Sequence, residues 1–270
     1  MIYDISYAFK DRSDFKSYDL EEFNTDFGFR YDLTNKISHY IILKYILKDY
    51  EITNTSASDS IKKLAGNNAD ILLNNTFNYS DLDSFIRPSR GTSISYFNTI
   101  SPATNNDNGY IKNLITYAKY YPYKKTNIFS FRTKIGNIYS LQNKELPIED
   151  KFSLGGRWLR GFDRFGVGPR ESRISYVGGQ NIIAAKFDFD RPILGTSDNP
   201  IDLNLFTDIG TVFDNKIDPT YANENIRASY GFGIKFYSPI GPIGFSWGFP
   251  LLSESHDIKK MFTFRVGIMN

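Results

Sequence analysis

The segment from Lys151 to Glu171, KFSLGGRWLRGFDRFGVGPRE, concentrates the side chains that could do chemistry. It mixes glycines, arginines, carboxylates and large aromatic residues, and no helical or strand period fits it. Arg160 lies near its centre. A guanidinium is permanently charged, and its planar fork matches a carboxylate. The chemistry that suits this segment is therefore charge pairing.

Arg160 requires acidic partners if the long loop at 141–178 folds into the lumen of a barrel. The next two expected strands carry Asp188 and Asp208, both at polar positions of an alternating pattern. We therefore predict that Arg160 pairs with Asp188 and Asp208 inside the lumen.

The residues around Arg160 suit a packed loop. Gly155, Gly156 and Gly161 would allow tight backbone turns near the loop tip. Phe162 and Trp158 would pack the loop against the wall. The alternative is an extracellular loop in which Arg-Gly-Phe occurs by chance, and spacing alone leaves both interpretations open.

This chain contains few of the residues that catalysis or metal binding usually requires. There is no cysteine, and the two histidines, His39 and His256, are far apart in the sequence. GFSWG at 244–248 matches the G-x-S-x-G nucleophile motif, which requires a strand, a sharp turn and a helix. Here the motif continues an alternating run and is followed by Phe249 and a proline. We expect no enzyme, no cofactor and no metal site.

Composition excludes some partners. The net charge of the 270 residues is +2 and no basic face is visible, so nucleic acid is not an expected partner. No run approaches the roughly 20 apolar residues of a membrane helix. A membrane β-barrel also has a polar average, because only alternate strand residues face lipid. No signal peptide is visible at the start of the chain.

Hydrophobic alternation is clearest near the C-terminus and predicts strands. Charged residues and glycines occupy one parity and aromatic residues the other, which is typical of a polar lumen and a lipid-facing exterior. A soluble β-sandwich is the alternative. For the last strand, the predicted lipid face consists of Phe262, Phe264, Val266 and Ile268.

Twelve strands are expected, joined alternately by short and long links. Short turns at one rim and long loops at the other are typical of outer-membrane barrels. A short helix is expected within the loop at 54–68. The strands are expected near 2–10, 21–32, 37–53, 69–80, 91–100, 110–121, 126–140, 179–190, 200–213, 226–238, 242–250 and 259–269.

Several motifs together resemble the Omp85 superfamily. FSLGGRWLRGF, followed by GVGPR and VGGQN, is similar to the inserted-loop signature of that family. DLDSFIRPSRG at 81–91, LFTDIGTVFD at 205–214 and the last two strands resemble further family motifs. The resemblance covers the whole chain, weakly before residue 68 and strongly after residue 150.

The resemblance implies an all-β, antiparallel transmembrane barrel of sixteen strands, preceded by periplasmic POTRA domains, with no reaction catalysed. It implies that a conserved loop enters the lumen and that its arginine pairs with acids on the two following strands, here Asp188 and Asp208. It also implies a seam that opens to receive client β-strands. The motif residues carried over to this chain are Gly155, Gly156, Leu159, Arg160, Gly161 and Phe162.

The chain departs from the family pattern in length. No POTRA domain is present, about twelve strands correspond to the last twelve of sixteen, and the last residue is Asn270. We therefore expect residues 1–270 to be the C-terminal portion of such a barrel, unable to close tightly alone, with the strands near 2–10 and 259–269 unpaired.

The expected function is insertion of outer-membrane proteins, by a truncated or split form of the family. Expected partners are the outer-membrane bilayer, nascent β-barrel clients, and a POTRA-containing N-terminal part or other assembly subunits, and the expected location is the bacterial outer membrane. The alternatives are a polypeptide transporter of the two-partner-secretion type and a passive pore.

Overall fold

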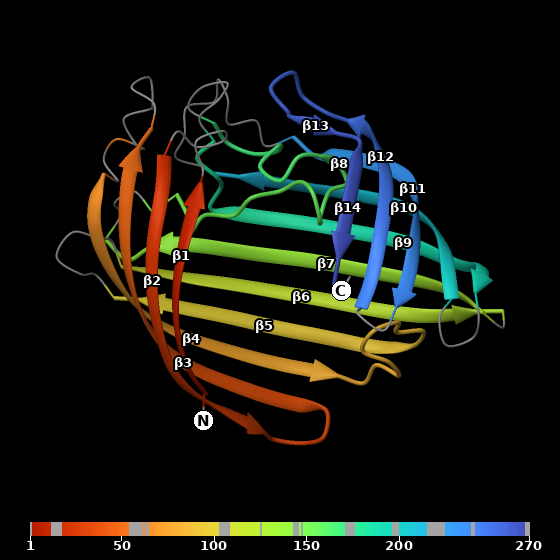
Figure 1. The fold of residues 1–270 in the computed structure, drawn as a ribbon, viewed down its shortest axis with the longest axis horizontal. Helices are drawn as coiled ribbons and strands as arrows, with labels where there is room; N and C mark the ends of the chain where they lie inside the picture. Colours follow the sequence, from red (N-terminus) through yellow and green to blue (C-terminus); the bar gives the residue numbers. More distant parts are fainter. Residues whose placement is uncertain are drawn as a thin grey trace.

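The structure is a computed structural model built around one antiparallel sheet of 12 strands in which chain order is strand order (Figure 1). Among the described residues, no helix is long and apolar enough to cross a membrane. The structure describes residues 2–11, 18–53, 62, 65–102, 109–124, 126–142, 146, 148–170, 176–195, 200–214, 225–238 and 241–267.

All twelve expected strands are present, with boundaries shifted by a few residues. Each strand pairs with the next strand of the sheet along the chain, as in a series of hairpins. The expected helix at 54–68 lies largely outside the described residues, and β4 already begins at Gly66. The strands are β1 (Ile2–Asp11), β2 (Tyr18–Asp32), β3 (Ile37–Ile52), β4 (Gly66–Ser80), β5 (Gly91–Ser101), β6 (Tyr110–Tyr123), β7 (Asn127–Ser140), β9 (Asn181–Gly195), β10 (Pro200–Phe213), β11 (Arg227–Ser238), β12 (Gly241–Leu252) and β14 (Phe262–Val266).

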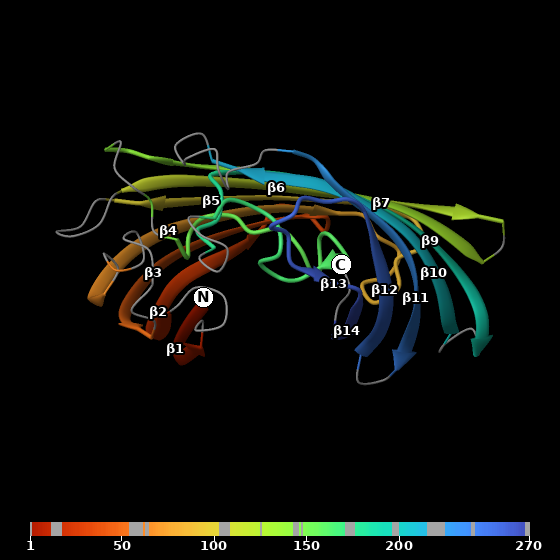
Figure 2. The same cartoon turned by 90° about the horizontal axis from the view of Figure 1, so that it is seen from above.

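The sheet curls into an open barrel with a concave inner face and a convex outer face (Figure 2). Successive residues of a strand point to opposite faces. In β9, the exposed Phe187 (52%) precedes the buried Asp188 (3%). The apolar parity therefore lies outside, and the charged parity lines the lumen, which is the arrangement of a membrane barrel.

The two ends of the sheet are not joined. Within the described ranges, β1 pairs only with β2 and β14 only with β12, so no ladder connects β1 to β14. In Figure 2 these two edge strands lie on opposite sides of the opening. This agrees with the expectation that the first and last strands are unpaired.

One expected strand is wrong in detail. Residues 259–269 were expected to form a single strand, but the ladder is interrupted at Met261. Before the interruption, β13 (Lys259–Lys260) pairs with β8 (Gly161–Phe162) in a separate two-stranded sheet. The loop after β7 is therefore a β-sheet partner of the segment that leads into β14.

A row of asparagines crosses the convex face. The strand register places one residue from each of five adjacent strands opposite the next. The rows on either side are apolar, as at Ile135 and Tyr139 on β7. Two side-chain hydrogen bonds join the middle three residues, with N–O distances of 2.9 and 3.2 Å. The row is Asn75, Asn98, Asn113, Asn137 and Asn181.

Candidate functional site: the loop inside the barrel

Arg160 lies at the centre of a buried network between the loop and the wall. Its Nε and Nη2 donate to the two carboxylate oxygens of Asp208 at 2.7 and 2.6 Å, and its backbone N–H donates to the same carboxylate at 2.9 Å. Its Nη1 donates to Asp188 at 2.9 Å and to Asn204 at 3.1 Å. The structure therefore brings together the three residues that the sequence analysis linked.

The register of β9 and β10 explains this convergence. Asp208 is opposite Lys186 and Phe206 is opposite Asp188, so the two aspartates are diagonal neighbours on the inner face. The guanidinium also lies 3.5 Å from the centre of the Phe206 ring. Burial by itself would lower the pKa of Arg160, but the two carboxylates outweigh it and raise this pKa above its ordinary value.

The network extends beyond the predicted residues. Arg132 donates to the second oxygen of Asp188 at 2.8 Å. Asn204 donates to Asp188 and to Asp190, and Lys235 contacts both oxygens of Asp190 at 2.7 and 2.8 Å. Sequence reasoning missed these partners because the alternating pattern marks many polar side chains as lumen-facing but does not determine which of them come into contact.

The other motif residues shape and pack the loop. Gly155 has a φ of +130°, and a Cβ there would lie 1.8 Å from the carbonyl oxygen of Asp163, so only glycine fits. Leu159 and Phe162 are fully buried, and Trp158 packs against the same cluster. This cluster joins loop side chains to wall side chains from β3 through β10, so the apolar core lies inside the barrel: Ile46, Leu72, Tyr110, Ile138, Leu146, Phe152, Leu154, Leu159, Phe162, Val167, Ile182, Ala184 and Val212.

A second anchor lies at the start of the loop, on the other half of the sheet. Lys48 of β3 is 5% exposed and lies 2.6 Å from Asp70 and 3.8 Å from Asp150 of the loop. The backbone carbonyl of Asp150 accepts a hydrogen bond from Lys112 at 2.5 Å. The hydroxyl of Tyr18 donates to Glu149. These residues were not predicted from the sequence, although the acidic pair Glu149 and Asp150 shortly before the glycine motif was a visible signal.

A third contact connects the turn between β4 and β5 to a distant strand. The turn between β4 and β5, within the expected motif at 81–91, sends Arg87 across to the start of β10. Its Nε and Nη2 donate to the two oxygens of the fully buried Asp202 at 2.8 and 3.0 Å. This forked pair connects the turn, by way of the lumen, to a strand that is distant in the sheet.

The loop also contacts the last hairpin at the edge of the sheet. Asp163 N–H donates to the carbonyl of Ile258 at 2.9 Å, and Ile258 N–H donates to Gly166 at 3.0 Å. These bonds extend the β8–β13 pairing. The position of the segment before β14 therefore depends on the loop.

A close approach of two glycines makes this contact possible. A Cβ on Gly248 of β12 would lie 2.6 Å from the backbone nitrogen of Gly161 and 2.7 Å from the carbonyl carbon of Arg160. Neither backbone atom can move without disturbing the Arg160 network. Gly248 belongs to the GFSWG run, and because β12 continues through it to Leu252, the sharp turn of a nucleophile motif is absent.

We expect Gly248→Ala to lower the free energy of unfolding by about 1–3 kcal/mol, since it forces a methyl group against loop backbone. The measurement is urea unfolding of the refolded protein in detergent micelles. Phe249→Leu, on the opposite face of the same strand, is the matched control and should change it by less than about 1.5 kcal/mol. Equal stability of Gly248→Ala and the unmodified chain would contradict this close approach.

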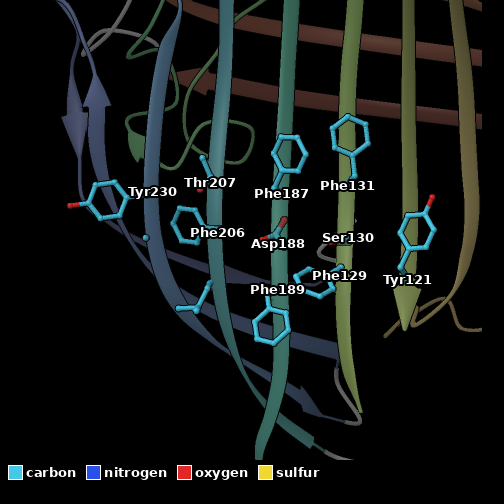
Figure 3. Close-up of a pocket in the computed structure, with 12 residues that line it drawn as sticks. Tyr121, Phe129, Ser130, Phe131, Phe187, Asp188, Phe189, Phe206, Thr207 and Tyr230 are labelled. Atoms are coloured by element: carbon cyan, nitrogen blue, oxygen red, sulfur yellow. The ribbon is translucent and has the colours of Figure 1, made fainter. Parts of the chain in front are cut away.

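The convex surface carries aromatic residues in register. Phe129 and Phe189 lie 4.8 Å apart between ring centres, and Phe131 and Phe187 lie 4.9 Å apart. They line an outward depression of about 540 Å³, and Figure 3 shows these rings side by side on adjacent strands. An aromatic exterior of this kind suits contact with lipid.

The predicted lipid face of the last strand lies on the same convex surface. Phe262, Phe264 and Val266 are 45%, 54% and 60% exposed. Ile268, the fourth residue of that prediction, lies outside the described residues.

The two histidines lie apart from each other in the structure. The His39 ring stacks on the Phe77 ring, with 3.8 Å between ring centres, and Nε2 of His256 lies 3.4 Å from Nη2 of Arg227.

Comparison with known proteins decides the family. The model of the Omp85 superfamily domain matches residues 1–269 of this chain. The chain belongs to the Omp85 superfamily. Its antiparallel barrel sheet with a loop in the lumen is the architecture that the resemblance to this family implied.

Several relatives of this Omp85 chain are named as components of protein assembly machineries. It is 25% identical to the outer membrane protein assembly factor BamA of Nitratidesulfovibrio vulgaris over 83% of this chain and 29% of that protein. It is 25% identical to the sorting assembly machinery 50 kDa subunit of Saccharomyces cerevisiae over 78% of this chain and 45% of that protein. The chain therefore spans less than half of the length of these relatives.

A solved structure supports the fold of this Omp85 chain. The crystal structure of BamA from Haemophilus ducreyi lacking POTRA domains 1-3 superposes with a TM-score of 0.84 at 20% sequence identity. The superposition covers 96% of this chain and 57% of that one.

Proposed function

We propose that this Omp85 chain acts in the assembly of outer-membrane β-barrel proteins, as the barrel part of an insertase in the bacterial outer membrane. The observation that carries the proposal is a curved sheet in which β14, within the described residues, pairs only with β12, beside a loop anchored in the lumen. The names of the bacterial relatives point to the same activity.

The physical basis is strand pairing. A free sheet edge presents a row of unpaired N–H and C=O groups, which a hydrocarbon environment cannot satisfy. An incoming strand satisfies them by adding to the edge. A client strand would pair with β14 in this way, and no covalent bond is made or broken, so the proposal assigns no enzyme activity and no cofactor.

Partners follow from this proposal. In this proposal the bilayer contacts the convex face, and nascent barrel clients contact the edge of β14. A POTRA-containing N-terminal part, or other assembly subunits, would deliver the clients. A passive pore is less favoured, because the loop fills much of the lumen with packed side chains such as Leu159 and Phe162.

The test is client crosslinking in cells depleted of their own assembly factor. The chain would be supplied joined to the POTRA domains and first strands of a bacterial relative. Because it contains no cysteine, Val266→Cys on β14 places a unique thiol in this part. We expect disulfides between this thiol and a cysteine-bearing client strand, together with client insertion.

The control thiol is Ile135→Cys, which is similarly exposed but lies in the middle of the sheet on β7. It should not be trapped by clients. Equal trapping at the two positions, or no client insertion in the presence of the folded chimaera, would refute the proposed function. Rescue by the chain without any N-terminal part would refute the expected need for such a partner.

A further inference from the structure

Arg265 is a cation at the open edge of the sheet. It lies on β14 between Phe264 and Val266, which are both more than half exposed on the convex face, so its side chain lies on the lumen parity. Its register partner on β12 is Gly244, which has no side chain. The neighbouring strand therefore supplies Arg265 with no counterion.

The lumen beside Arg265 contains further cations. A small cavity of about 20 Å³ is lined by Arg265 together with Arg132, Arg160 and Lys235. Asn204 of β10 and the β12 residues Gly244, Phe245 and Ser246 complete its wall. Four positive side chains from four parts of the chain, namely β7, the loop, β11 and β14, thus line one cavity.

The carboxylates nearby are already engaged. Asp208 receives the fork of Arg160, and Asp188 is shared by Arg160 and Arg132. Asp190 is contacted by Lys235 through both oxygens. Within the part of the chain that the structure describes, Arg265 has no ion pair and no side-chain hydrogen bond.

A partly buried guanidinium among like charges is unfavourable unless an anion neutralises it. The planar fork of arginine selects a carboxylate, which it can bind through two parallel hydrogen bonds. The lining of the cavity therefore favours a bound carboxylate.

We propose that this cavity is a carboxylate site, and that the strand added to the free edge of β14 supplies the carboxylate from an Asp or Glu on its lumen-facing parity. The inference rests on the proposed function, because it requires strand addition at β14. Directly opposed residues of paired strands have Cβ atoms about 4.5–5.5 Å apart, within reach of this guanidinium. The site would thus select the charge and the register of the added strand.

The test uses the purified chain carrying Val266→Cys in detergent micelles, with short peptides of alternating pattern. Each peptide has one cysteine on the outward parity and one variable residue beside it, which faces the lumen next to Arg265 when the disulfide forms. The variable residue is Glu, Gln or Lys. We expect the Glu peptide to be trapped about tenfold more than the Gln peptide, which corresponds to about 1.4 kcal/mol, and the Lys peptide least.

Charge reversal supplies the control. In Arg265→Glu the order should invert, so that the Lys peptide is trapped best. Arg30→Glu, a change at an exposed cation of β2, should leave the order unchanged. Equal trapping of the three peptides would overturn the carboxylate site and leave strand addition intact, whereas no trapping of any peptide would overturn both.

A second measurement distinguishes the source of the anion. Sodium acetate should raise the urea midpoint of the unmodified chain relative to sodium chloride at equal ionic strength, and Arg265→Gln should abolish the difference. An acetate effect without a peptide preference would overturn the strand as the source, because a free anion then fills the cavity. An acetate effect that persists in Arg265→Gln would overturn the site itself.

Discussion

Replacement of Arg160 by alanine should lower the free energy of unfolding by about 3–5 kcal/mol, because it leaves buried carboxylates without their counterion. Asp188 and Asp208 are each at most 3% exposed. In this variant Asp188 would still accept a hydrogen bond from Arg132 at 2.8 Å. Asp208 would lose both hydrogen bonds from the Arg160 guanidinium. The larger effect therefore comes from Asp208.

Arg160→Lys should recover only part of this loss, since an ammonium cannot reproduce the forked geometry. Urea unfolding in micelles measures the stability, and protease cleavage within 141–178 measures the release of the loop. Arg30→Ala is the matched control, because Arg30 and Asp32 form an exposed, solvent-screened pair whose loss should leave the free energy of unfolding nearly unchanged. A protease-resistant loop and unchanged stability in Arg160→Ala would show that the pairing does not anchor the loop.

Replacement of Lys48 by methionine should have an effect of similar size, about 3–5 kcal/mol, at the other end of the loop. Lys48 and Asp70 are 5% and 3% exposed, with their charged atoms 2.6 Å apart, and Asp150 lies 3.8 Å from the same ammonium. Methionine has a similar length but no charge. It would leave Asp70, which is buried, and Asp150, which is half-buried, without this partner.

Lys44→Met is the control for this second prediction. Lys44 lies on the same strand and parity, and its partner Asp26 is 3.8 Å away with both side chains about one-fifth to one-quarter exposed. It should lower the unfolding free energy by less than about 1 kcal/mol. The double change Lys48→Met with Asp70→Asn should be less destabilising than Lys48→Met alone. Equal effects of the Lys48 and Lys44 changes would argue against the second anchor.

The two anchors place the loop across the sheet. Arg160 connects it to β9 and β10, whereas Lys48, Lys112 and Tyr18 connect its first part to β2, β3 and β6. Loss of either anchor would free one half of the loop. Because β13 pairs with β8 inside this loop, we infer that the Arg160 anchor also positions the segment leading to β14.

Much of the fold follows from local sequence pattern. Alternation in segments such as that around Phe187 and Asp188 determines which face of a strand is apolar, and turn residues separate the strands. The parity of Asp188 and Asp208 already placed both carboxylates on the polar face. Since a strand has a period of two, these assignments need only the neighbouring residues along the chain.

Pairing between distant parts of the chain required the tertiary structure. Lys48 approaches Asp150, and Gly248 approaches Gly161, across separations that no local pattern encodes. The break before β14 has the same origin, since Lys259 and Lys260 pair with the loop rather than with β12. A period of two fixes the face of a residue, whereas register and curvature fix its neighbours. The row of five asparagines and the cluster of cations around Arg265 were therefore visible only once the strands had been paired and the sheet had curved around its loop.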